Sequence, residues 1–199
     1  MKRNLLTAGL MLLALGSANS MRTDDHPGKR DVFRAKLIGF HEVPALSTPA
    51  TGEFSMKIND AETAFDFKLT WADLVGPTVT QSHIHLGQSG VNGGIMIWFC
   101  GSAATPGPSG TPVCPAAAGG TVEGTIDASK VVGPAGQGIA ASEFAEALKA
   151  IRSGVAYANV HSATFPGGEI RGQVRGRGKF LLAAAGQEDD HDHDNQSKK

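Results

Sequence analysis

The sequence of 199 residues has little net charge, a single tyrosine and only two cysteines. A formal net charge of -1 argues against a general nucleic-acid-binding protein, which carries a basic surface and a high pI. Neither a Ser-His-Asp ordering nor a helix-borne pair of histidines offers a catalytic centre. These features therefore disfavour a general nucleic-acid-binding protein and indicate no catalytic centre of these kinds.

The first 20 residues have the three parts of a secretory signal peptide. Lys2 and Arg3 precede an apolar run at 5–15 and small residues at 16–20. The alternative is an N-terminal membrane anchor, but a run of about 11 residues is shorter than the ~20 needed to span a bilayer. We therefore predict a signal peptide at 1–20, export to the periplasm or the exterior, and no transmembrane segment in the mature chain.

Composition divides the remaining chain into three parts. Residues 21–31 are polar and lack apolar periodicity, which predicts a flexible linker. Residues 32–180 are long enough for one domain with one core. Residues 181–199 include the acidic, histidine-containing stretch 188–194, which predicts a disordered tail with weak, unspecific affinity for divalent metals.

The two cysteines, Cys100 and Cys114, flank a loop at 101–113 that is rich in glycine and proline. An exported protein folds in an oxidising compartment, which favours a disulfide over a pair of thiol metal ligands. In the chain-entropy model, closing a loop of about 15 residues stabilises the fold by roughly 3 kcal/mol.

Alternating apolar residues predict antiparallel strands through most of the domain. One helix is predicted at 142–154, with Ser142 as its cap, Gly154 at its end and an apolar stripe that packs on the sheets. Residues 169–177 alternate charged or polar side chains with apolar and small ones. We interpret their basic stripe, which includes Arg171, as a solvated edge or outer face of the sheet rather than as an anion site.

Histidines lie in two strand-like segments that are far apart in the sequence. In an extended strand, alternate side chains share a face, so His83 and His85 point the same way. His161 shares a face with Tyr157 and Asn159 in the downstream segment. If the two segments are neighbours in a sheet, three imidazoles converge there.

Two interpretations of these histidines remain open. Imidazoles suit copper and zinc, and His83, His85 and His161 would supply three ligands, with His41 or Glu169 completing the set. The other interpretation is structural: the histidines hydrogen-bond neighbouring loops and hold the strand ends together.

Several ordered motifs resemble the CHRD domain, a family named after chordin. They are found at residues 33–44 and 49–52, 82–85 and 90–93, and 157–161 and 165–173. The resemblance implies an extracytoplasmic, antiparallel Greek-key β-sandwich, similar to immunoglobulin or copper/zinc superoxide dismutase domains, here with one short helix. The family usually has glutamine where this chain has His41, which makes His41 a fourth candidate ligand.

Three functions are consistent with these features. The first is a non-catalytic interaction module that binds a protein or a polysaccharide outside the cytoplasm. The second is a copper- or zinc-binding protein that uses the histidines. The third, an enzyme of the superoxide dismutase type, is disfavoured because only four histidines lie outside the predicted linker and tail, too few for a two-metal site. The growth-factor binding of chordins is not carried over, since a shared fold does not fix function.

Overall fold

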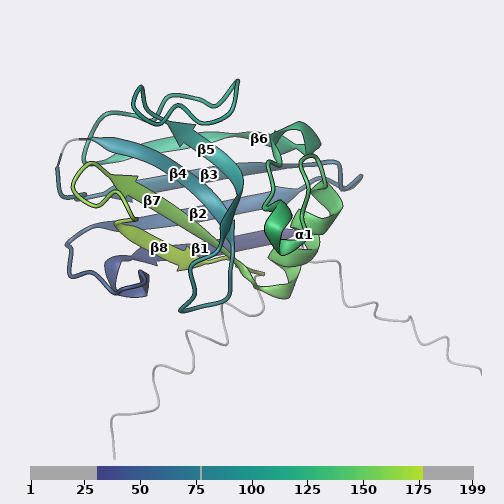
Figure 1. Cartoon of the computed structure of the whole chain (residues 1–199), viewed down its shortest axis with the longest axis horizontal. Coiled ribbons are helices and arrows are strands. Elements are labelled where there is room, and N and C mark those ends of the chain that lie inside the picture. The colour runs from purple at the N-terminus through teal and green to yellow at the C-terminus, as the bar shows by residue number, and fades with distance from the viewer. Residues whose placement is uncertain (1–30, 77, 177–199) are drawn as a thin grey trace, which may run out of the picture.

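The chain folds as antiparallel β-structure with one short α-helix among the described residues (Figure 1). The computed structural model describes residues 31–76 and 78–176, so the predicted signal peptide and acidic tail lie outside the described residues. The strands are β1 Val32–Ile38, β2 Thr51–Ile58, β3 Ala64–Ala72, β4 Val79–Leu86, β5 Gly94–Gly101, β6 Gly120–Asp127, β7 Ala156–Ser162, β8 Ile170–Gln173 and β9 Arg175–Gly176.

The alternation of apolar and polar residues in the sequence accounts for strands β1, β2 and β3. In β1, buried Phe33, Ala35 and Leu37 alternate with more exposed residues. The hairpin of β2 and β3 repeats the pattern, with Phe54 paired to Leu69 across the strands. An antiparallel strand that buries one face needs this alternation, because successive side chains leave the sheet on opposite sides.

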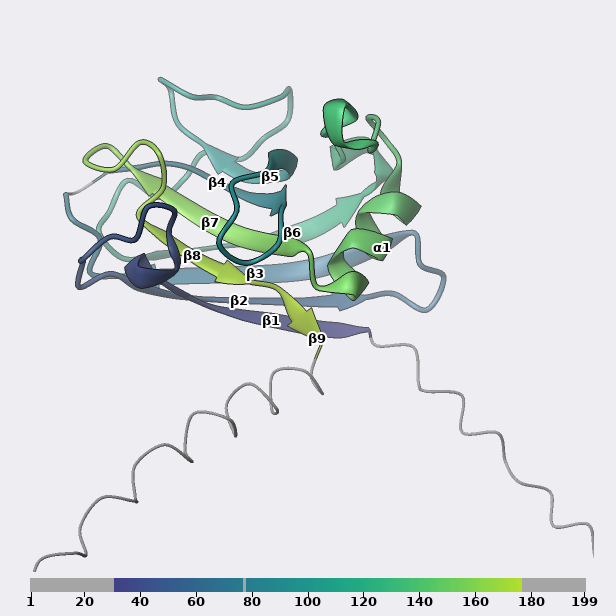
Figure 2. The ribbon, with the colours of Figure 1, turned by 60° about the horizontal axis from the view of Figure 1, so that its bottom comes forward.

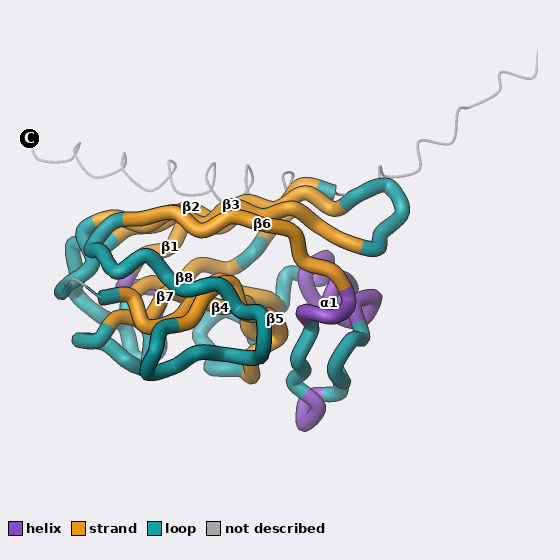
Figure 3. The backbone as a smooth tube through the Cα atoms, turned by 90° about the horizontal axis from the view of Figure 1, so that it is seen from above, coloured by secondary structure: helices purple, strands orange, loops and turns teal. Residues whose placement is uncertain are grey.

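The strands form one curled sheet whose two halves face each other. The order is β5-β4-β7-β8-β1-β2-β3-β6, and β9 pairs with β1. Viewed from above, β1, β2, β3 and β6 form one layer and β4, β5, β7 and β8 the other (Figure 3). Between the layers, the ring of Phe99 lies 5.2 Å from that of Phe54 and 4.3 Å from that of Phe67. The predicted all-β, antiparallel fold with one helix is confirmed.

The helix α1, Phe144–Ser153, lies at one end of the layers (Figure 2). Its apolar stripe is buried as predicted, and the ring of Phe144 stacks on that of Phe65 at 6.0 Å. Gly154 ends the helix in the left-handed conformation, also as predicted. The prediction that Ser142 caps it is wrong: Ser142 has φ 67° and its N–H bonds to Val131, so the helix begins two residues later.

Three short 3-10 helices complete the regular structure of the described residues: η1 Gly39–His41, η2 Ala128–Lys130 and η3 Ala135–Gln137. None of the described helices is long and apolar enough to cross a membrane.

The disulfide between Cys100 and Cys114 is present, with a sequence separation of 14. Replacing both cysteines by serine should lower the free energy of unfolding by roughly 3 kcal/mol, because the unfolded chain regains the freedom of the open loop. Urea denaturation at neutral pH measures this loss, and the reduced wild-type protein is the matched control. A double variant as stable as the oxidised protein would contradict the prediction.

Candidate metal centre

Strands β4 and β7 bring the three histidines together. Their antiparallel register places His83 opposite Asn159 and His161 opposite Gln81, so His161 lies diagonally from His83. His85 follows on the same face of β4, and Ile84 points into the core on the other side. The two segments are thus neighbours in the sheet, which was the condition for convergence of the imidazoles.

The three imidazoles face one another at short range. One ring nitrogen from each of the three histidines lies within 4.8 Å of the corresponding nitrogens of the other two. The ring of His83 is 5.2 Å from that of His85 and 5.0 Å from that of His161, centroid to centroid. The side chains are almost fully shielded, with exposed fractions of 0% for His83, 8% for His85 and 6% for His161.

Backbone carbonyls fix the orientation of two of the rings. Nδ1 of His85 lies 2.9 Å from the carbonyl oxygen of Gly93, and Nδ1 of His161 lies 2.9 Å from that of Pro166. A carbonyl accepts, so each Nδ1 carries the proton and each Nε2 presents a lone pair. A carbonyl partner on the distal nitrogen is the usual support of a metal-bound histidine.

The remaining ring nitrogens of the cluster have no hydrogen-bond partner. They are Nε2 of His85, Nε2 of His161 and both nitrogens of His83, and all are buried. An unpaired buried polar atom costs about 1–3 kcal/mol, so several in one place call for a ligand that pairs with them. This is the feature of the site that a structural role for the histidines does not explain.

The cluster is uncharged at neutral pH. Burial lowers the pKa of His83 to about 2, helped by the charges that His161 and His85 would carry. Burial likewise lowers the pKa of His85 to about 4 and lowers the pKa of His161, against the opposing effect of their carbonyl partners. A metal binds neutral imidazole, so no proton needs to be displaced.

A buried arginine lies beside the cluster. The ring of Tyr157 stacks on His85 at 4.8 Å, and the guanidinium carbon of Arg171 lies 3.6 Å from the centre of the tyrosine ring. Arg171 donates to the side-chain oxygen of Asn92 and to the carbonyl of Val91. The interpretation of Arg171 as part of a solvated edge or outer face is wrong: the loop after β4 covers its side chain, and the residue is 2% exposed.

Glu42 is a second buried group that the sequence did not single out. Its Oε1 accepts from the side-chain amide of Asn159, the residue opposite His83. Burial raises the pKa of Glu42 to about 7, against the lowering effects of Asn159 and Arg171. A Cβ at Gly168, which has φ +124°, would lie 2.9 Å from this carboxyl, so glycine is needed there.

The two residues suggested to complete the ligand set lie elsewhere. His41 is exposed at the end of η1 and is not in the cluster. Glu169 is buried, but its Oε1 accepts from the hydroxyl of Thr48 and from the backbone N–H of Val75. The structure therefore brings together His83, His85 and His161 alone.

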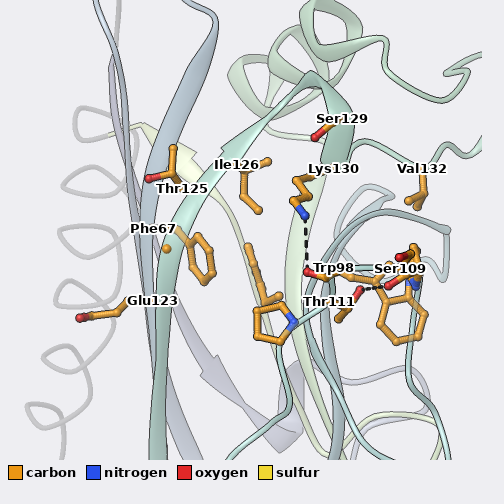
Figure 4. Close-up of a pocket in the computed structure, with 15 residues that line it drawn as sticks. Phe67, Trp98, Ser109, Thr111, Glu123, Thr125, Ile126, Ser129, Lys130 and Val132 are labelled. Carbon is orange, nitrogen blue, oxygen red and sulfur yellow. Dashed lines mark hydrogen bonds between the residues drawn. The ribbon is translucent and has the colours of Figure 1, made fainter.

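Trp98 on β5 connects the cluster to a pocket of about 270 Å³. Its ring meets that of His83 edge-on at 4.2 Å. The pocket lies among β3, β5, β6 and the disulfide-closed loop, and Figure 4 shows Phe67, Trp98 and Lys130 among the residues that line it. Lys130 Nζ donates to the carbonyl of Gly110 across it.

The metal-free protein should lose stability in acid. Below pH 6.5 the unfolded chain takes up protons at His83, His85 and His161, whereas the native state, with lowered pKa values, does not. Each histidine then costs up to about 1.4 kcal/mol per pH unit as the pH falls through this window. Urea denaturation between pH 7 and pH 5, with a chelator present, measures the slope.

The titration of Glu42 opposes the loss of stability in acid that the histidines cause, so a variant at Glu42 is a control for that prediction. Because the pKa of Glu42 is raised, the native carboxyl keeps a proton between pH 4.5 and about 7 that the unfolded chain loses. The contribution of Glu42 to the free energy of unfolding therefore falls as the pH rises through this window. The three histidines change the free energy of unfolding more than the one carboxyl does, so stability still falls in acid. In the variant Glu42→Gln, which lacks the opposing effect, the free energy of unfolding should fall more steeply as the pH is lowered. An unfolding free energy independent of pH would contradict the lowered pKa values.

Comparison with known proteins gives a family but no individual relative. Neither the curated proteins nor the solved structures include a significant match to the chain. The model of the CHRD domain matches residues 33–174, which is more than half of the chain and includes all three histidines of the cluster. The chain therefore belongs to the CHRD domain family.

Proposed function

We propose that this protein is an exported, non-catalytic CHRD protein that binds one copper or zinc ion through His83, His85 and His161. The observation that carries the proposal is the set of buried ring nitrogens without partners, on three imidazoles that lie close together on neighbouring strands. Imidazole is a common ligand of both metals.

The cluster needs only small movements to hold an ion. Metal–nitrogen bonds of about 2.0–2.1 Å imply nitrogen–nitrogen separations of roughly 3.4 Å in a tetrahedral site. The present separations are at most 4.8 Å, so rotation of the side chains can close the gap. His83 has both nitrogens free and adapts most easily, whereas the carbonyls of Gly93 and Pro166 hold the other two rings.

Two features support export. The first 20 residues have the pattern of a signal peptide. The disulfide between Cys100 and Cys114 suits an oxidising compartment, in which such bonds persist.

The metal content of the mature protein tests the site. After equilibration with copper or zinc and gel filtration, the wild type should retain about one ion per chain that the His83→Ala/His85→Ala/His161→Ala variant lacks. Both proteins keep the same tail, so weak binding by its histidines cancels. His41→Ala is the matched control, because this exposed histidine lies outside the cluster.

The result has clear alternatives. Equal metal content in the wild type and the triple variant would contradict the proposal and leave the histidines as structural groups. If the triple variant does not fold, single His161→Gln substitution with circular dichroism as a check on folding gives the same comparison, and an unchanged metal content would again oppose the site.

A second candidate function is recognition of a polysaccharide at the pocket beside Trp98. The pocket combines this indole with the hydroxyl groups of Ser109, Thr111, Thr125 and Ser129. Apolar surfaces with a few placed polar groups are typical of small-molecule sites, and an indole face suits a sugar ring. Oligosaccharide binding by the chelator-treated protein, lost in Trp98→Ala, would support this function; binding unchanged in that variant would oppose it.

A further inference from the structure

We infer that the histidine cluster is a site for monovalent copper, Cu(I), in preference to a divalent ion. The inference rests on the proposed function, that His83, His85 and His161 hold a metal, and adds the charge and identity of that metal. Three features carry it: the neutral donors, their number, and the positive charge beside them.

The donor set carries no negative charge. Among the described histidines, cysteines and acidic residues, only three imidazoles form a metal-binding group. An ion held there keeps its full charge inside a site whose side chains are at most 8% exposed. The cost of removing an ion from water rises with the square of its charge, so burial penalises a divalent ion about four times as much as a monovalent one.

The number of donors fits Cu(I) better than the divalent ions. Zn(II) takes four ligands and Cu(II) favours a tetragonal set, whereas Cu(I) is stable with three ligands in a plane. The suggested fourth ligands do not serve, because neither the exposed His41 nor the buried Glu169 belongs to the cluster. A divalent ion would therefore need water in a site that is almost closed to solvent.

Arg171 adds a fixed positive charge one ring away from His85. The guanidinium carbon lies 3.6 Å from the centre of the Tyr157 ring, which stacks on that histidine at 4.8 Å. The field of this charge repels a bound cation, and it repels a divalent ion twice as strongly. Glu42 offsets this charge only in part, because burial raises its pKa to about 7 and leaves the carboxyl about half ionised at neutral pH.

The decisive experiment compares affinities of the mature, full-length protein for Cu(I), Cu(II) and Zn(II). Competition with a chromophoric chelator for each ion, under anaerobic conditions for Cu(I), gives the three dissociation constants at pH 7. Only binding lost in the His83→Ala/His85→Ala/His161→Ala variant is counted. The expected result is a Cu(I) dissociation constant at least 100-fold below those of both divalent ions.

Substitution of Arg171 tests the electrostatic argument. Arg171→Gln and Arg171→Lys both remove the guanidinium that donates to Asn92 and Val91, but only the glutamine variant loses the charge. Removing one unit charge across two stacked rings should shift the preference for Cu(I) over Zn(II) by roughly 10- to 30-fold toward zinc. The lysine variant should keep the wild-type preference.

The outcomes distinguish failure of the metal site itself from failure of the preference for Cu(I). Zn(II) or Cu(II) bound as tightly as Cu(I) would overturn the inference and leave the metal site standing. An unchanged preference in Arg171→Gln would overturn the electrostatic argument for it. No histidine-dependent binding of any ion would overturn the metal site itself, and the preference with it.

Discussion

The pairing of β4 with β7 is the interaction on which the site depends. It places His83 opposite Asn159 and sets His161 one diagonal step away. Because side chains alternate in a strand, a slip of one residue would turn these imidazoles toward the core and Ile84 toward the loops. Burial of Ile84 on the opposite face therefore fixes the register and, with it, the convergence of the histidines.

The outer face of this layer is unusual in being polar and yet buried. Loops cover it, and their backbone carbonyls satisfy part of the polar surface, as Gly93 does for His85 and Pro166 does for His161. The same loop that holds His85 also accepts the hydrogen bonds of Arg171. Low dielectric under these loops strengthens every charge effect there, which is why burial dominates the pKa values of the cluster.

Much of the fold and part of the site could be predicted from the sequence. Period-two patterning identified β1 and the β2–β3 hairpin, and strand periodicity alone placed His83 and His85 on one face. The burial of Arg171 and Glu42 could not be predicted, because it depends on loops whose path over the sheet leaves no periodic signal. Ser142 failed as a cap for a similar reason: its residue type suits a helix end, but the chain uses it in a left-handed turn.

The unpaired ring nitrogens favour the proposed metal site over a purely structural role for the histidines. A structural role requires that each imidazole bond to its surroundings, and only one nitrogen of His85 and one of His161 do so. His83, the most deeply buried of the three, bonds to nothing within the described chain. A shared ligand pairs three of the four remaining nitrogens, one from each imidazole, and so offsets most of the cost of burying them. Among metal ions, the one held at least electrostatic cost by neutral donors with Arg171 beside them is an ion of low charge.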